Sequence, residues 1–237
     1  TTPTISEIVG TDSDGTPLCN LQEDTVLYKC YRNPREIIVC AHALGFGIYG
    51  EIVQMLESRE QWADIGYEVI EGDFVEGSAI VIERPEKNSI SAISENQNPS
   101  DIVQICVCDS FADEIRNVAK QIQDDMRDGL RADDVLVVVV DDRNAKAYLA
   151  SIADELQTLN IESNNIHTDN FGIRDFSKEG LVTLSTVHKA KGNEAFMVYV
   201  VGVDALFATS TGVRERNLLF TAMTRAKGWL RLSGIGQ

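Results

Sequence analysis

The sequence has no run of 18 apolar residues, and no basic stretch followed by an apolar one opens the chain. From these absences we expect neither a transmembrane helix nor a secretory signal peptide. Five cysteines among 237 residues are too few for a disulfide framework, and their odd number favours a reducing compartment. We therefore expect a cytoplasmic protein that does not bind membranes. The chain also lacks an initiator methionine, and we expect a piece of a longer protein.

Basic residues are scarce in most of the chain and in excess at its end. The net charge is −16 with histidine neutral. Residues 1–180 hold 14 basic and 34 acidic side chains, whereas residues 181–237 hold seven basic and three acidic ones. A uniformly acidic protein would repel nucleic acid and anionic membranes. The positive C-terminal part leaves room for an anion-binding function there.

The N-terminal part predicts a polar lead-in, a strand, a helix and an insertion. Residues 1–25 are polar and rich in turn formers, and residues 26–31 predict a short strand. Asn33 is predicted to cap a helix that begins at Pro34, and a second helical stretch is predicted around residues 52–56. Residues 62–100 hold two β-rich pieces joined by Gly-rich and acidic turns, which predicts an inserted hairpin.

The rest of the chain alternates between strands and helices. The predicted strands cover residues 102–108, 135–140, a short piece near 166, 182–185, 197–201 and 230–232, and the predicted helices cover 111–127, 145–159 and 213–226. Such alternation predicts an α/β fold with a mostly parallel sheet and helices on both faces. A chain of this length with 43% apolar residues forms one domain with a modest insertion.

The pair Cys106 and Cys108 allows two interpretations. Two positions apart on a predicted strand, the thiols share one face, and a metal pair would need further ligands that the surrounding sequence lacks. Buried thiols in the core are the favoured interpretation.

Three polar segments are candidates for chemistry. In the first, Tyr31 and Arg32 stand between a strand end and a helix start, where a ring can stack on a base and a guanidinium can bind an anion. A core tyrosine beside a solvated arginine is the simpler alternative.

The second segment, residues 183–194, runs from a strand into a loop rich in hydroxyl, imidazole and ammonium groups. Ligands of an open α/β sheet lie beyond the carboxyl ends of its strands. Thr186 and His188 can donate to phosphate oxygens, Lys189 and Lys191 add positive charge, and Gly192 allows a close backbone approach. A structural histidine and a solvated loop are the alternative.

The third segment lies on the predicted helix 213–226, which Gly228 is predicted to end. At about 100° per residue, Arg214, Asn217, Thr221 and Arg225 share one stripe of the helix, and the apolar residues share the other. Arg225 would also complement the helix dipole at the C-terminal end. Arg216 falls on the apolar side, where its stem can lie over the core.

Taken in chain order, these segments resemble motifs IV, V and VI of superfamily I DNA and RNA helicases of the UvrD/Rep type. The matching stretches are Tyr31-Arg32-Asn33, residues 182–194 (VTLSTVHKAKGNE) and residues 216–226 (RNLLFTAMTRA). The resemblance implies that residues 26–237 form the second RecA-like motor domain of such a helicase, with the insertion at about 62–100. The family's large subdomain between motifs IV and V is absent or much reduced.

The resemblance also implies a role for each site residue. Tyr31 would stack on the adenine of ATP, and Arg32 would reach the γ-phosphate. Glu194 would contact the ribose, with Gly192 beside it, and Arg225 would act as the arginine finger. Thr186, His188 and Lys189 would contact a single strand of DNA or RNA. Asn193 and Asn217 depart from the family pattern, so contacts at these two positions are not carried over.

Half of such an ATP site is missing from the sequence. No G-x-x-x-x-G-K-[S/T] stretch occurs, and no apolar strand ends in the Asp-Glu pair that holds Mg²⁺. We therefore expect the N-terminal RecA-like domain of the same protein to supply the phosphate loop and the metal, and this chain alone to be inactive.

Two other classes of function remain open. A non-catalytic RecA-like module could serve protein interaction or regulation, which the acidic residues 1–180 would suit. A small-molecule enzyme on a flavodoxin-like sheet is disfavoured, because His42, His167 and His188 have no local partner for acid-base or nucleophilic chemistry.

Overall fold

The computed structural model describes residues 10, 12–15, 26–48, 50, 52, 55–167, 175–208 and 212–236. Its centre is a six-stranded sheet with the order β3-β8-β7-β4-β6-β5, in which all neighbouring strands run parallel. The strands are β3 (Val103–Cys108), β4 (Val135–Val139), β5 (Ser163–Asn165), β6 (Val182–Thr186), β7 (Ala195–Val201) and β8 (Ala226–Ile235). The predicted α/β fold with a parallel sheet is confirmed.

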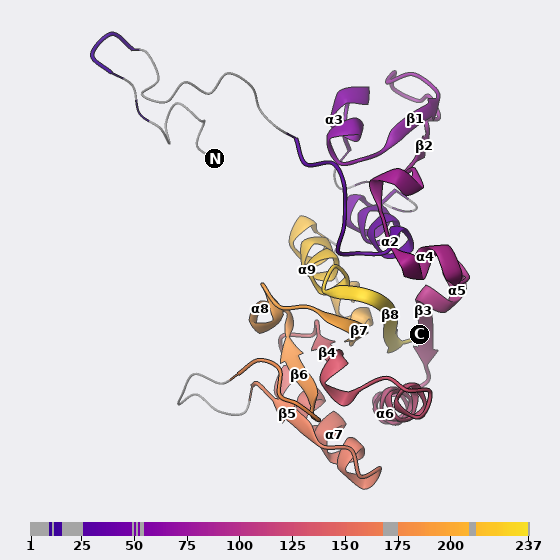
Figure 1. Cartoon of the computed structure of the whole chain (residues 1–237), viewed down its shortest axis with the longest axis vertical. Coiled ribbons are helices and arrows are strands. Elements are labelled where there is room, and N and C mark those ends of the chain that lie inside the picture. Colours follow the sequence, from indigo (N-terminus) through magenta and orange to yellow (C-terminus); the bar gives the residue numbers. More distant parts are fainter. Residues whose placement is uncertain are drawn as a thin grey trace.

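Helices cover both faces of the sheet (Figure 1). One face packs against α6 (Phe111–Arg127) and α7 (Ala145–Thr158), and the other packs against α2 (Arg35–Phe46), α8 (Val187–Ala190) and α9 (Val213–Met223). Every residue of β4 is fully buried, because alternate side chains enter the two cores. Short 3-10 turns lie at Ala132–Asp134 and Val203–Leu206. Within the described residues, no helix is both long and apolar enough to span a bilayer.

The insertion lies between α2 and β3, on the side of the molecule away from α6 and α7 (Figure 1). It contains α3 (Arg59–Asp64), the antiparallel hairpin of β1 (Glu68–Glu71) and β2 (Val81–Glu83), a 3-10 turn at Glu86–Asn88, α4 (Ala92–Asn96) and α5 (Pro99–Ile102). Arg84 is only 4% exposed and donates to the carbonyls of Tyr28, Ile65 and Asn88. This buried guanidinium fixes the predicted hairpin to the segment before α2.

Four local predictions differ from the structure or fall outside it. The predicted strand 26–31 is wrong: only an isolated bridge joins Cys30 to Ser89, because no strand lies beside this exposed segment. Residues 52, 55 and 56 are not helical. Gly228 lies inside β8 instead of ending α9, and a Cβ there would lie 3.0 Å from the Phe196 carbonyl oxygen. Of the predicted lead-in 1–25, only residues 10 and 12–15 are described.

His42 connects the insertion to α9. Its Nδ1 lies 3.0 Å from the hydroxyl of Tyr67, and its ring stacks on Phe46 and Phe220. Burial, and then the positive charge of Arg84, lower the pKa of His42 from 6.5 to about 4. The imidazole is therefore neutral at physiological pH. The sequence left a buried and a solvated role open for His42, and the structure gives it the buried one.

We expect this histidine to make the folded chain less stable in acid. Between pH 6.5 and pH 4 the unfolded chain takes up a proton at His42 and the folded chain does not, so the free energy of unfolding falls as the pH falls through this window. Urea titrations of wild type and His42→Gln should give profiles that converge toward pH 4. His188→Gln, whose side chain is 64% exposed, is the control and should leave the wild-type profile unchanged. Parallel profiles for His42→Gln and wild type would contradict the assignment.

Candidate nucleotide and nucleic-acid sites

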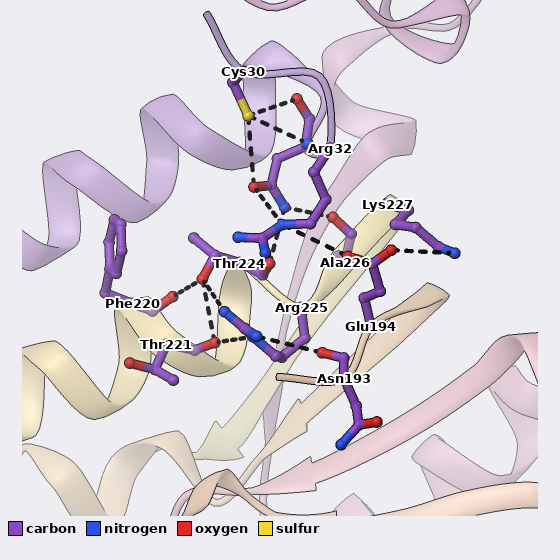
Figure 2. A network of polar contacts seen from close by, with 11 residues as sticks. Cys30, Arg32, Asn193, Glu194, Phe220, Thr221, Thr224, Arg225, Ala226 and Lys227 are labelled. Atoms are coloured by element: carbon purple, nitrogen blue, oxygen red, sulfur yellow. Dashed lines mark hydrogen bonds and ion pairs between the residues drawn. The ribbon is translucent and has the colours of Figure 1, made fainter. Parts of the chain in front are cut away.

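Three positive side chains gather around one carboxylate at the amino ends of two central strands (Figure 2). Arg32 precedes α2, Glu194 precedes β7, Arg225 lies in the turn between α9 and β8, and Lys227 lies in β8. The whole loop of residues 183–194 is predicted from the sequence to lie beyond the carboxyl ends of strands. That expectation is wrong for Glu194, because the chain crosses back through α8 before β7 begins.

Glu194 is shared between two of these cations. Its Oε2 lies 4.0 Å from Nε of Arg32, and its Oε1 lies 3.6 Å from Nζ of Lys227. Nζ of Lys227 also lies 4.6 Å from the centre of the Phe196 ring. The side chains of Arg32 and Glu194 are 42% and 41% exposed, so the pair is open to solvent and to an incoming anion.

The Arg225 guanidinium is held by the chain around it. Nε donates to the Thr221 carbonyl at 2.9 Å, Nη1 to the Asn193 carbonyl at 3.4 Å, and Nη2 to the Thr224 hydroxyl at 3.3 Å. Burial and the nearby Arg32 lower the pKa of Arg225, while Glu194 raises it. The two arginines and Glu194 thus lie close enough to influence one another electrostatically, and Figure 2 shows them facing one region.

Asn33 positions this cluster instead of capping α2. Helix α2 begins at Arg35 with Pro34 as its N-cap, and no side chain caps it. The Asn33 side chain is 1% exposed, and its Nδ2 donates to the carbonyls of Thr224 and Ala226 at 3.1 and 2.6 Å. Its Oδ1 accepts from Nε of Arg32 at 3.4 Å. The amide therefore joins the segment that carries Arg32 to the turn that carries Arg225.

Tyr31 and Gly192 flank the cluster in sequence. Tyr31 is 71% exposed, so the alternative of a core tyrosine is wrong and its ring is free to stack. Gly192 has a φ of +88°, which glycine adopts without strain. A Cβ at Gly192 would meet no atom within 4 Å, so the turn, and not a close approach within this chain, requires the glycine.

The first half of motif V lies elsewhere, at the carboxyl ends of β4 and β6. Thr186 is buried and precedes α8. Nε2 of His188 lies 3.3 Å from a carboxylate oxygen of Asp142, which follows β4. Nζ of Lys189 donates to the Ile166 carbonyl at 3.0 Å. The structure therefore separates these three residues from the Arg32–Glu194–Arg225 cluster.

A groove of about 550 Å³ between α8 and α9 brings further basic residues to His188. Lys191 and Arg214 line it, together with Asn217 and Thr221. The shared stripe of Arg214, Asn217 and Thr221 was predicted from the sequence without a ligand. Lys189 and Lys191 were both predicted to add positive charge to the loop, but only Lys189 was predicted to contact the strand. The helical period of 213–226 was the signal that could have found Arg214.

Lys227 is the residue of the cluster that sequence reasoning missed altogether. It lies two positions beyond Arg225, inside a strand that was predicted to begin only at residue 230. The sequence therefore did not predict that the side chain of Lys227 points toward Glu194. Among the described residues, no group of three or more His, Cys, Asp or Glu side chains could hold a metal ion. The cluster can bind an anion, and the groove can bind a chain of phosphates with neutral polar contacts.

A comparison with protein families agrees, over part of the chain, with the resemblance to superfamily I helicases. Residues 181–233 match the family model of the UvrD-like helicase C-terminal domain. No curated protein matches the chain significantly. Among solved structures, the C-terminal domain of a possible DNA helicase from Lactobacillus plantarum WCFS1 is 22% identical, with a TM-score of 0.42; the match covers 58% of this chain and 76% of that one.

The Arterivirus nonstructural protein 10 helicase is also similar. In its complex with DNA it is 13% identical with a TM-score of 0.39, and the match covers 71% of this chain and 39% of the viral one. The same helicase without DNA gives a TM-score of 0.36 at 13% identity, covering 71% and 38%. The resemblance to the UvrD-type helicase C-terminal domain is thus confirmed for residues 181–233, which carry motifs V and VI.

Proposed function

We propose that this chain is the second motor domain of an ATP-dependent superfamily I helicase that moves along a single strand of nucleic acid. The observation that carries the proposal is the convergence of Arg32, Arg225 and Lys227 on Glu194. Three cations around one carboxylate leave an excess of positive charge on an open surface. That arrangement suits a polyphosphate that a second domain presents from the opposite side.

The proposed chemistry is charge neutralisation at a γ-phosphate. Phosphoryl transfer depends mostly on positioning and on compensation of negative charge, and an arginine finger contributes about 10³–10⁵ in rate. Arg225 would leave its carbonyl partners to reach the phosphate, and Arg32 would release Glu194 to do the same. Glu194 would then turn to a ribose hydroxyl, and Tyr31 would stack on the adenine.

The missing half of the site belongs, in this proposal, to the N-terminal RecA-like domain of the same protein. Mg²⁺ bound with ATP would supply positive charge that compensates the charge of the phosphates. The residues described here fit the outer edge of a triphosphate, because they offer guanidinium and ammonium groups and no cluster of metal ligands. The phosphate loop and the metal-binding carboxylates would therefore come from the other domain.

The groove between α8 and α9 is the proposed path of the single strand. Lys191 and Arg214 would neutralise phosphates, and Thr186 and His188 would donate to the same backbone. Lys189 would lie at the margin of this path, because its ammonium group already donates to a carbonyl.

The test is ATP hydrolysis by the full-length protein. We expect single-stranded DNA or RNA to stimulate turnover, and the isolated chain to hydrolyse no ATP. Lys191→Ala with Arg214→Ala should raise the strand concentration needed for half-maximal stimulation, with a weaker dependence on salt, since two phosphate contacts are lost. Lys146→Ala, an exposed residue on α7, is the control. A full-length protein that shows no stimulated turnover would overturn the proposal.

The insertion favours one other function, a protein-interaction or regulatory module. Residues 57–95 hold ten acidic and three basic side chains, and a cavity of about 540 Å³ opens between α2, α3 and β2. An acidic surface beside an apolar cavity suits a basic protein partner better than nucleic acid. The reading frame decides between the two: an upstream phosphate loop and Asp-Glu pair would be present in a motor and absent from a module without catalysis.

A further inference from the structure

Two thiols stand side by side on an outer strand of the sheet. Cys106 and Cys108 alternate with Ile105 and Val107 on β3, which pairs with β8 on one side and is the last strand of the described sheet. Ile105 and Val107 are 70% and 73% exposed, so β3 lies at the surface. Cys106 is half-buried and Cys108 is buried, so the first thiol is the more accessible of the two.

The geometry brings the sulfur atoms into contact. Their Sγ atoms are 3.8 Å apart, and Nδ2 of Asn117 on α6 lies 2.7 Å from the Cys106 sulfur and 3.8 Å from the Cys108 sulfur. Two residues of a strand span about 6.6 Å between Cα atoms. That value lies within the upper part of the range that disulfides bridge, about 4.4–6.8 Å. Closure would bring the sulfurs from 3.8 Å to about 2 Å, and it would require a local bend of this outer strand that brings the two Cβ atoms to about 3.5–4.5 Å from each other.

We propose that Cys106 and Cys108 form a dithiol that a low-molecular-weight disulfide, such as oxidised glutathione, converts into a disulfide within β3. The Cys106 thiolate attacks one sulfur of the reagent, forms a mixed disulfide and expels one glutathione thiolate. The Cys108 thiolate then attacks the Cys106 sulfur of that mixed disulfide and expels the second glutathione thiolate. Two protein thiols are oxidised, the reagent is reduced to two thiols, and the two protons pass to the expelled thiolates or to solvent.

The environment of each thiol sets this order. Cys106 is the more exposed thiol and is therefore the one that the reagent reaches first, and the Asn117 amide donates to its sulfur. The pKa of Cys108 is raised to about 11, mainly by burial and also by the neighbouring Cys106 and Glu114, against the hydrogen bond from Asn117, which lowers it. The second step is therefore the slow one. Its rate should rise about tenfold per pH unit below that pKa, as the thiolate fraction does.

The experiment is incubation of the reduced chain with oxidised glutathione, followed by intact-mass analysis, thiol titration and peptide mapping. We expect wild type to lose two hydrogens and two titratable thiols, with the bridge mapped to the peptide that contains residues 106–108. Cys108→Ser should stop at a stable glutathione adduct on Cys106. Cys106→Ser should react at least tenfold more slowly at position 108. Cys40→Ser, which removes a half-buried thiol of α2, is the matched control and should close the bridge like wild type.

Two results would overturn the proposal. One is a wild-type chain that accumulates a lasting glutathione adduct on Cys106 without losing two hydrogens. The other is a wild-type chain that stays fully reduced while a small unhindered dithiol in the same tube is oxidised. Both serine substitutions are nearly isosteric, and the circular dichroism of each variant shows whether β3 is intact. The outcome is independent of ATP hydrolysis, so it stands or falls apart from the motor function.

Discussion

Arg225→Ala is expected to reduce ATP turnover by the full-length protein by about 10³–10⁵, with ATP binding largely retained. The side chain is placed for this role by the turn between α9 and β8, which aims its guanidinium at the region shared with Arg32 and Glu194. Its present partners are two carbonyls and a hydroxyl, all neutral acceptors. A triphosphate oxygen carries a full negative charge and can compete with each of them.

Lysine at this position tests the shape of the group as well as its charge. Arg225→Lys keeps one positive charge but loses the planar fork that holds several acceptors at once, so we expect it to recover little of the lost turnover. Single-turnover hydrolysis and nucleotide binding, measured on the same preparations, separate chemistry from affinity. Arg127→Ala is the matched control, because Arg127 lies on the surface of α6, where it forms an ion pair with Asp124. Turnover by Arg225→Ala within a few-fold of wild type would exclude the finger role.

The loss must also be distinguished from local unfolding. Arg225 ties the end of α9 to the start of β7, so its removal costs some hydrogen bonds of the turn. These bonds are partly open to solvent and contribute about 0.5–1.5 kcal/mol each. A loss of that size leaves a domain of ordinary stability folded. A thermal midpoint close to that of wild type, together with absent turnover, would therefore assign the effect to chemistry.

The sheet and its covering helices could be predicted because local pattern and tertiary environment agree there. The helix Phe111–Arg127 has an apolar stripe against α7 and the sheet, and Ser110 caps it through the Asp113 amide. The apolar run of β4 identifies a strand that is buried on both faces. In these elements the apolar pattern assigns each side chain to the core or to the surface, so the sequence alone predicts the elements.

The strand predicted for residues 26–31, before α2, is wrong because its apolar residues lie beside no strand in the described part of the chain. Leu27 is 89% exposed, although the run around it has the composition of a strand. The predicted helix cap at Asn33 is wrong for a related reason. An asparagine before Pro-Arg-Glu predicts a cap, but its amide instead satisfies two carbonyls of a turn 191 and 193 residues away in the sequence. A contact of such separation has no trace in a local pattern.

The residues of the candidate site could be predicted from the sequence, but their positions relative to the sheet could be predicted only in part. Motif order identified Arg32, Glu194 and Arg225, and the structure brings them together. The motif could not show that His188 and Glu194, six positions apart, serve opposite ends of the sheet. That separation follows from the crossing of α8, whose four residues carry the chain back toward the start of β7.

The largest expected loss of stability follows removal of the Glu114 carboxylate, which is fully buried between α6 and the carboxyl ends of two strands. Oε2 accepts from the Tyr148 hydroxyl at 2.9 Å, and Oε1 accepts from the Gly202 amide at 3.0 Å and the Ser233 hydroxyl at 2.6 Å. Burial, with Glu114 next in effect, raises the pKa of Tyr148, so its hydroxyl remains a donor at neutral pH. One side chain thereby joins α6, α7, β8 and the turn after β7.

Glu114→Ala should lower the free energy of unfolding by about 3–5 kcal/mol, since it leaves three buried donors without an acceptor and opens a cavity. Glu114→Gln should cost about 1 kcal/mol, because its oxygen can still face the Gly202 amide and the Ser233 hydroxyl while its amide donates to Tyr148. Urea unfolding of the chain measures both, with Tyr148→Phe as the single-bond comparison. The size of the gap between alanine and glutamine is the informative quantity. If the two variants lose equal stability, neither the neutral hydrogen bonds nor the packed volume of this side chain contributes, and the negative charge of the Glu114 carboxylate must stabilise this edge of the sheet.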